Sequence, residues 1–133
     1  MLAPSWPALH ALLDHLLATG PVPRLIRFLD RAEHWRVVVV GGVAVTGYRN
    51  DVRPDDFRSA PAEATSVPGP VGSMACDAAD ALLTEWAGVD VLVDEGGAAF
   101  VIEVNTPCSL AVPGVLDTAA VADALVAHLL PPG

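Results

Sequence analysis

Two apolar runs on either side of a Gly96–Gly97 pair constrain the fold of this chain more than any other feature. The runs extend over residues 88–105, and paired glycines between two such runs are typical of a β-hairpin turn. If these glycines occupy the two central turn positions, Asp90 lies directly opposite Glu103, with Cβ atoms about 5 Å apart. Asn105, two residues after Glu103, then lies on the same face of the hairpin.

These three side chains would place two carboxylates and an amide oxygen on one face of otherwise apolar strands. Directly opposed carboxylates repel each other unless one is protonated or a cation lies between them. Oxygen donors of this kind suit Mg²⁺, which binds through one or two carboxylates and keeps positions for phosphate oxygens. The pattern therefore predicts a metal site formed by Asp90, Glu103 and Asn105. The alternative is a solvent-facing carboxylate pair, which the register disfavours because it places Leu92 opposite Val101 on that face.

The composition is that of one folded domain over residues 1–133. Apolar residues make up 53% of the chain, enough to bury a core. No apolar stretch reaches the roughly 20 residues that span a bilayer, and no signal-peptide pattern is present, so we expect a cytoplasmic location. The formal net charge of −9 disfavours binding to nucleic acid or to anionic membranes. Cys76 and Cys108 form neither a disulfide framework nor a zinc pattern, and we expect reduced thiols.

Cap residues and apolar periodicity predict three helices. Ser5 can cap the first, which would end near Ala18, and the others are expected over residues 73–86 and 118–130. A short strand is expected over residues 25–29.

A second hairpin is expected over residues 35–48, again with a Gly-Gly pair at its turn. Centring the turn on that pair places Arg36 opposite Gly47 and puts Arg49 on the same face. Two arginines beside a small residue could clamp an anion; the alternative is two strand-end arginines that extend into water. Valines on both faces indicate that the hairpin is covered on both sides. Together these elements predict an α+β fold, an antiparallel sheet packed with helices.

Three segments, in this order, resemble the C-terminal portion of the ATP-grasp ligases of the RimK and glutathione-synthetase-like branch. The Gly-Val-Asp and Glu-Val-Asn-Thr-Pro motifs within residues 88–107 resemble the metal-binding end of those enzymes. Residues 35–42 resemble their strand-turn segment with a phosphate-side arginine. Residues 56–59 resemble their Asp-Phe-Arg-Ser-Asn loop, with Ala60 in place of the closing Asn.

The resemblance implies that a carboxylate is joined to an amine through an acyl-phosphate, with ATP as co-substrate and Mg²⁺ or Mn²⁺ as cofactor. The resemblance implies that Asp90, Glu103 and Asn105 are the metal ligands. The resemblance also assigns stabilisation of developing negative charge to Arg36 and Arg58.

The resemblance implies nucleotide contacts from a hinge near residues 24–30 as well. Phe28 and Leu29 would touch the base, and Arg36 the phosphates. Arg49 is a further candidate for nucleotide binding, because the predicted register puts it on the face of Arg36. His34 lies two residues before Arg36, and the sequence gives no basis for assigning it a role.

The chain contains no lysine, whereas ATP-grasp enzymes use lysines of a first subdomain to hold the nucleotide phosphates. The resemblance therefore covers only the C-terminal half of the nucleotide site, and three interpretations stay open. The chain is part of a ligase for a small carboxylate and amine or a peptide, completed by a first subdomain on a partner chain or on a part of the protein outside this sequence. It is an inactive remnant that binds metal–nucleotide or a protein. Or it is an interaction module whose acids are coincidental. Apolar surface on half a cleft also makes a homodimer conceivable.

Overall fold

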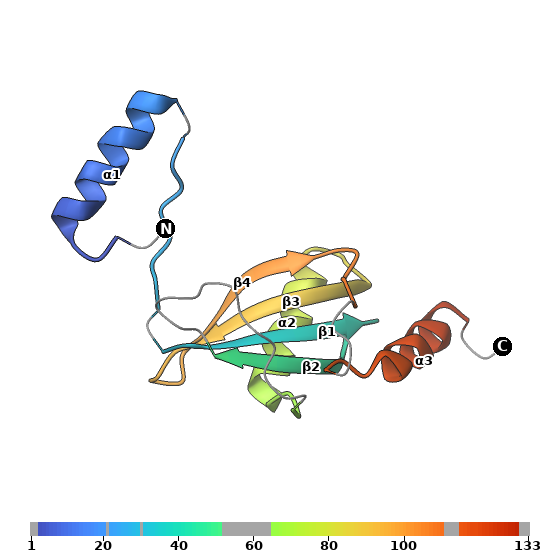
Figure 1. Cartoon of the computed structure of the whole chain (residues 1–133). Helices are drawn as coiled ribbons and strands as arrows, with labels where there is room; N and C mark the ends of the chain where they lie inside the picture. The colour runs from blue at the N-terminus through green and yellow to red at the C-terminus, as the bar shows by residue number, and fades with distance from the viewer. Residues whose placement is uncertain (1–2, 21, 30, 52–64, 111–114, 131–133) are drawn as a thin grey trace.

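The computed structural model of this chain describes residues 3–20, 22–29, 31–51, 65–110 and 115–130. Within these ranges it is the predicted α+β fold, a four-stranded antiparallel sheet with helices (Figure 1). The elements in chain order are α1 (Trp6–Thr19), β1 (Glu33–Val40), β2 (Val43–Asp51), α2 (Gly69–Ala81), β3 (Trp86–Val93), β4 (Ala99–Asn105) and α3 (Thr118–Leu129).

The sheet joins the two predicted hairpins side by side. Its strand order is β2-β1-β3-β4, so β1 and β3 are the central strands and each hairpin contributes one edge strand. Between the central strands Arg36 pairs with Asp90. This pairing brings the two segments that resemble the ligase motifs into direct contact.

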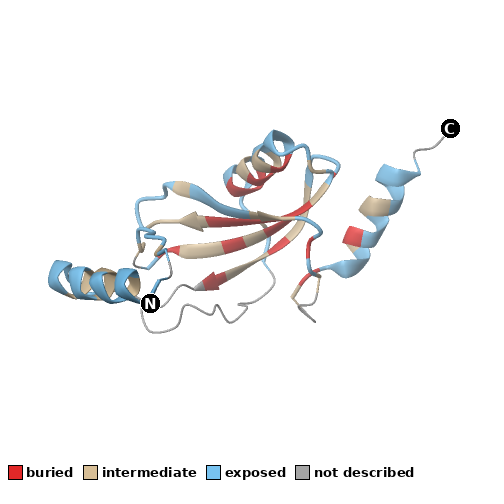
Figure 2. Ribbon diagram, turned by 90° about the horizontal axis from the view of Figure 1, so that it is seen from above, coloured by how far each residue is buried: buried red, intermediate tan, exposed pale blue. Residues whose placement is uncertain are grey.

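The two faces of the sheet are covered differently (Figure 2). Helix α2 packs its small residues Ala75 and Ala79 on one face. The core on that side consists of Trp35, Val37, Val39, Ala87, Val89 and Val91 together with the helix. Helix α3 covers one end of the other face, where Val38 and Val40 pack with Val121. Strand β1 is thus buried on both sides, as expected from its valine run. The expectation does not hold for the whole hairpin, because β2 is an edge strand and its Val43 is 62% exposed.

Helix α2 begins and ends earlier than the predicted span of residues 73–86. Pro70 lies in its first turn, where backbone N–H groups form no hydrogen bond within the helix, so the missing N–H of proline is tolerated. At the other end Trp86 pairs with Val40 and starts β3, so the strand takes residues that the periodicity assigned to the helix. Leu82 and Leu83, which the predicted span placed in the helix, lie in the connecting turn and are 60% and 90% exposed.

The first and last helices agree with the sequence expectation. Ser5 caps α1 by accepting from Ala8 N at 3.4 Å, and Gly20 ends it with a φ of 102°. Asp117 caps α3 by accepting from Ala120 N at 2.9 Å. None of the helices in the described ranges is long and apolar enough to cross a membrane.

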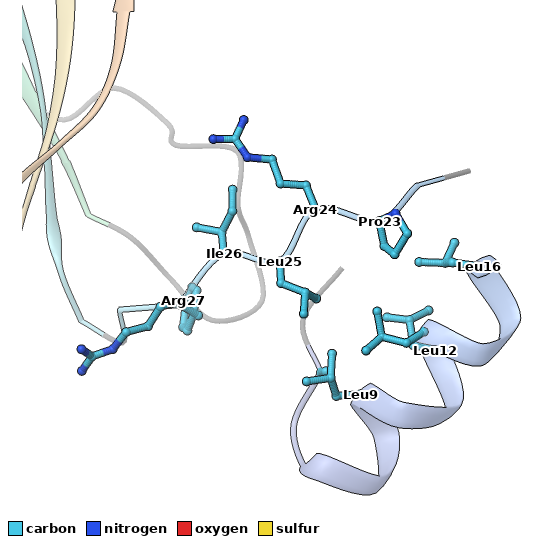
Figure 3. Close-up of a pocket in the computed structure, with 11 residues that line it drawn as sticks. Leu9, Leu12, Leu16, Pro23, Arg24, Leu25, Ile26 and Arg27 are labelled. Atoms are coloured by element: carbon cyan, nitrogen blue, oxygen red, sulfur yellow. The ribbon is translucent and has the colours of Figure 1, made fainter. Parts of the chain in front are cut away.

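Helix α1 makes no close contact with any other described helix or strand. Its leucines instead face the chain that follows it, where Leu9, Leu12 and Leu16 point toward Pro23 and Leu25 (Figure 3). The predicted strand over residues 25–29 is wrong, because residues 22–29 form no strand pairing in the structure. A strand requires a neighbour for its backbone groups, and this segment packs beside a helix.

Candidate functional site

The β3–β4 hairpin has the predicted register at the end that carries Asp90, Glu103 and Asn105. Asp90 pairs with Glu103, and Asn105 pairs with Gly88. Glu103 is exposed and lies across from a buried Asp90, which is 8% exposed. The side chains singled out from the sequence therefore lie on neighbouring positions of β3 and β4.

Near the turn the register differs from the prediction by one residue. Leu92 pairs with Phe100 instead of Val101, and a bulge beyond this pair restores the predicted pairing. The cause is Asp94, whose side-chain Oδ1 accepts from the backbone N–H of Gly96 at 2.9 Å and of Ala98 at 2.8 Å. These bonds stabilise a wider turn than the two-residue form that the glycine pair suggested.

A second bulge corrects the expectation for the β1–β2 hairpin. The ladder follows the predicted register next to the turn and shifts by one residue between Val38 and Val39. Arg36 therefore lies opposite Tyr48 and not opposite Gly47. A bulge adds one residue to a strand, and valines on both faces of this hairpin leave no alternation that could reveal it.

The shift separates the two arginines of the expected anion clamp. Arg49 lies opposite Trp35 and forms an ion pair with Glu33 Oε1 at 2.9 Å. Glu33 also accepts from Trp35 Nε1 at 3.1 Å. These residues belong to the face that carries α2, whereas Arg36 lies on the opposite face. The prediction that both arginines share one face is wrong.

A polar cluster surrounds Asp90 on the face away from α2. Arg36 Nη1 donates to Asp90 Oδ2 and forms an ion pair with it. Asn105 Nδ2 donates to the same oxygen at 3.1 Å. His34 Nε2 lies 3.0 Å from the other oxygen, Oδ1, and Asn50 Nδ2 lies 3.3 Å from His34 Nδ1. We refer to these five residues as the Asp90 cluster.

Sequence reasoning missed two members of this cluster, His34 and Asn50. Strand alternation from Arg36 could have placed His34 on its face. Asn50 pairs with His34 only because of the β1–β2 bulge, so its place could not be predicted.

Arg36 lies close above β3, and the packing there requires glycine. A Cβ on Gly88 would lie 2.5 Å from Cys108 Sγ and 2.8 Å from Arg36 Nε. Burial raises the pKa of the Cys108 thiol and of Tyr48, and in both cases the nearby Arg36 charge partly offsets the effect. The Arg36 side chain is itself only 14% exposed, so water screens its charge weakly. Cys108 and Cys76 are both free thiols, as expected.

The donor types in this region fit a magnesium ion. Two carboxylates on paired positions are oxygen ligands of the kind that Mg²⁺ takes. Asn105, whose Nδ2 donates to Asp90, has an amide oxygen that could serve as a third. Within the described ranges no three His, Cys, Asp or Glu side chains could hold a metal by themselves. A cation here would therefore depend on Asn105 and on oxygens from a ligand.

The remaining residues predicted from the resemblance lie elsewhere or outside the described part. Phe28 and Leu29 are half-buried in the segment after α1. Phe28 lines a cavity of about 660 Å³ with the α1 leucines, and none of its described lining residues belongs to the Asp90 cluster. Arg58 and Ala60 lie outside the described residues.

The comparison with protein families gives an extended match. The family model of the RimK-like ATP-grasp domain matches residues 8–127. The chain belongs to this family. The search of curated proteins gave no significant match.

Solved structures of ATP-grasp enzymes share the fold. The ATP-grasp ligase PsnB, complexed with a minimal precursor, Mg and ADP, superposes with a TM-score of 0.60 at 20% identity over 90% of this chain and 50% of that one. The D-alanine–D-alanine ligase from Bacillus anthracis, complexed with ATP, gives 0.59 at 19% identity over 93% and 46%. The macrocyclase MdnC from Microcystis aeruginosa MRC, bound with precursor peptide MdnA, gives 0.54 at 15% over 74% and 34%. This RimK-like chain thus spans half or less of the length of these structures.

Proposed function

We propose that this chain forms the C-terminal half of the nucleotide site of an ATP- and Mg²⁺-dependent carboxylate–amine ligase. The observation that carries the proposal is the pairing of Asp90 with Glu103, with Asn105 bonded to Asp90 Oδ2. Membership of the RimK-like ATP-grasp family supports it. Similar folds that hold ADP with Mg, in PsnB, and ATP, in the D-alanine–D-alanine ligase, support it further.

In the proposed reaction ATP phosphorylates a carboxylate, and an amine then displaces phosphate from the acyl-phosphate. A bound magnesium ion would offset the charge of the phosphate oxygens. Asp90, Glu103 and Asn105 would hold that ion. Arg36, in its poorly hydrated position, would stabilise negative charge that develops on the transferred phosphoryl group. Arg58 is a further candidate for this role.

The substrate class that we propose is a peptide. PsnB and MdnC, two of the similar structures, are complexed with precursor peptides. A first subdomain that supplies phosphate-binding lysines would complete the site, since this chain has none.

A non-catalytic metal–nucleotide module is the second candidate, and the absence of lysine from the chain favours it. A neighbouring reading frame that encodes a lysine- and glycine-rich first subdomain would favour the ligase instead.

Calorimetric titration of the chain with ADP, in Mg²⁺ or in chelator, tests the Mg²⁺-dependent nucleotide binding that both candidate functions require. We expect ADP to bind in Mg²⁺ and to bind much more weakly in chelator. Glu103→Gln should weaken the Mg²⁺-dependent binding, because it removes one anionic ligand. Glu95→Gln, which changes an exposed acid in the same hairpin, is the matched control and should bind as the wild type does. ADP binding that is absent, or equal with and without Mg²⁺, would contradict the proposal.

A further inference from the structure

The carboxylate of Asp90 is held from two sides by different groups. Arg36 and Asn105 both donate to Oδ2. The imidazole of His34 approaches the other oxygen, Oδ1, at 3.0 Å. The rotation of the carboxylate about its last side-chain bond therefore depends on His34 at one oxygen and on two donors at the other.

The proton on His34 can be assigned from the groups that face its ring. Asn50 presents Nδ2 to His34 Nδ1 at 3.3 Å, and an amide NH₂ group can only donate. Nδ1 must then be the acceptor, so the neutral ring carries its proton on Nε2. Nε2 in turn donates to Asp90 Oδ1. A directed chain of hydrogen bonds thus runs from Asn50 through His34 to Asp90.

Burial and strand register keep these hydrogen bonds in one arrangement. Asn50 is 1% exposed and lies opposite His34 across β2 and β1. The side chains of His34 and Asp90 are 20% and 12% exposed. His34 lies opposite Leu92, two residues from Asp90 on β3, so the bond crosses the sheet diagonally. An imidazole fixed on both nitrogens in such surroundings has little freedom to turn.

We propose that His34, oriented by Asn50, is a positioning residue that fixes the Asp90 carboxylate for the cation. This inference rests on the proposed function, because it concerns the same site. With Oδ1 held by His34, Oδ2 is kept on the side of Asn105, which is another of the proposed metal ligands. Groups that hold a metal ligand by its second atom commonly affect metal affinity by roughly 10–100-fold.

Titration of the chain with Mn²⁺ at a fixed concentration of ADP tests the inference. It is followed by the electron spin resonance signal of the free ion and corrected for the Mn²⁺ that ADP binds by itself. His34→Leu removes the donor to Asp90, and we expect an affinity about tenfold lower than that of the wild type. His34→Gln keeps an N–H at the position of Nε2 and should recover most of the loss. His15→Leu makes the same kind of change on an exposed position of α1 and should leave the affinity unchanged. Urea unfolding of each variant confirms that the folded state is measured.

The outcomes separate the inference from the proposed function. If the wild type binds Mn²⁺ and His34→Leu binds it equally well, the inference is overturned while the proposed function stands. If the wild type binds no Mn²⁺ beyond that bound by ADP itself, both are overturned. Nitrogen NMR of the metal-free chain provides a readout that is independent of metal binding. It should show a protonated Nε2 and an unprotonated Nδ1 for His34, and the reverse tautomer would overturn the inference by itself.

Discussion

Arg36 and Asp90 face each other across the two central strands and form an ion pair with little access to water. Their side chains are 14% and 12% exposed. From the sequence, Asp90 could be recognised only as one of two opposed acids whose repulsion a cation would relieve. In the structure the cation against Asp90 is a guanidinium from the neighbouring hairpin. The pair therefore joins the predicted metal ligands to the predicted phosphate-binding arginine.

Removing Arg36 should destabilise the fold even without any ligand. Arg36→Met leaves Asp90 buried without its counter-charge, and we expect a loss of about 3 kcal/mol in the free energy of unfolding, measured in urea. Arg31→Met is the matched control, because Arg31 pairs with Glu95 on the surface and is 75% exposed. Its loss should stay below about 1 kcal/mol. Equal losses in both variants would mean that the Arg36–Asp90 pair has no structural role.

Gly88 should not tolerate a methyl group. Gly88→Ala places a Cβ within 2.5 Å of Cys108 Sγ, and overpacking of this kind destabilises by about 1–3 kcal/mol. Adding Cys108→Ala to Gly88→Ala should recover part of the loss, which a double-mutant cycle measures. Gly69→Ala is a control in open space, because nothing lies within 4 Å of its added Cβ. A Gly88→Ala variant as stable as Gly69→Ala would show that the Cys108 loop is not packed on β3.

Stability should fall at alkaline pH because of two groups near Arg36. Burial raises the pKa of Cys108 and of Tyr48 in the folded state. Both groups deprotonate more readily in the unfolded chain, so their contribution is complete below about pH 8 and is lost as the pH rises through the folded pKa values. Urea midpoints between pH 7 and 10.5 measure this loss. It should be smaller in the variant carrying Cys108→Ala and Tyr48→Phe, and an unchanged alkaline loss would contradict the assignment.

Helix α1 should contribute little to the stability of the sheet. Leu12 points toward the segment after the helix, and α1 makes no close contact with a described strand, so Leu12→Ala should change the urea midpoint only slightly. Val89→Ala removes two methyl groups from a fully buried core position and should cost about 2 kcal/mol. Losses of similar size would show that α1 packs on the core.

Much of this architecture could be predicted from local signals. Strand alternation together with a turn gave the Asp90–Glu103 pairing correctly, and capping residues located α1 and α3. The errors all lie where a long-range or side-chain interaction decides between local alternatives. Asp94 widened one turn through its own hydrogen bonds. Pairing with β1 drew Trp86 out of the predicted helix and into a strand.

The candidate site could be predicted only in part for the same reason. Asp90 and Asn105 belong to one hairpin, so local geometry brings them together. The contacts of His34 and Arg36 with Asp90 require β1 and β3 to be neighbours, which no local pattern states. Asn50 additionally needs a bulge that the valine-rich strands do not signal.

The most direct test of the account is to map a bound cation onto the chain. Mn²⁺ broadens the NMR signals of nuclei close to it, so its effect can be followed residue by residue in the presence of ADP. We expect the strongest broadening at Asp90, Glu103 and Asn105 and at Arg36 on β1, with much less along α2 on the opposite face. Broadening centred on the exposed acids of α2 or on α3, with the Asp90 cluster unaffected, would contradict it.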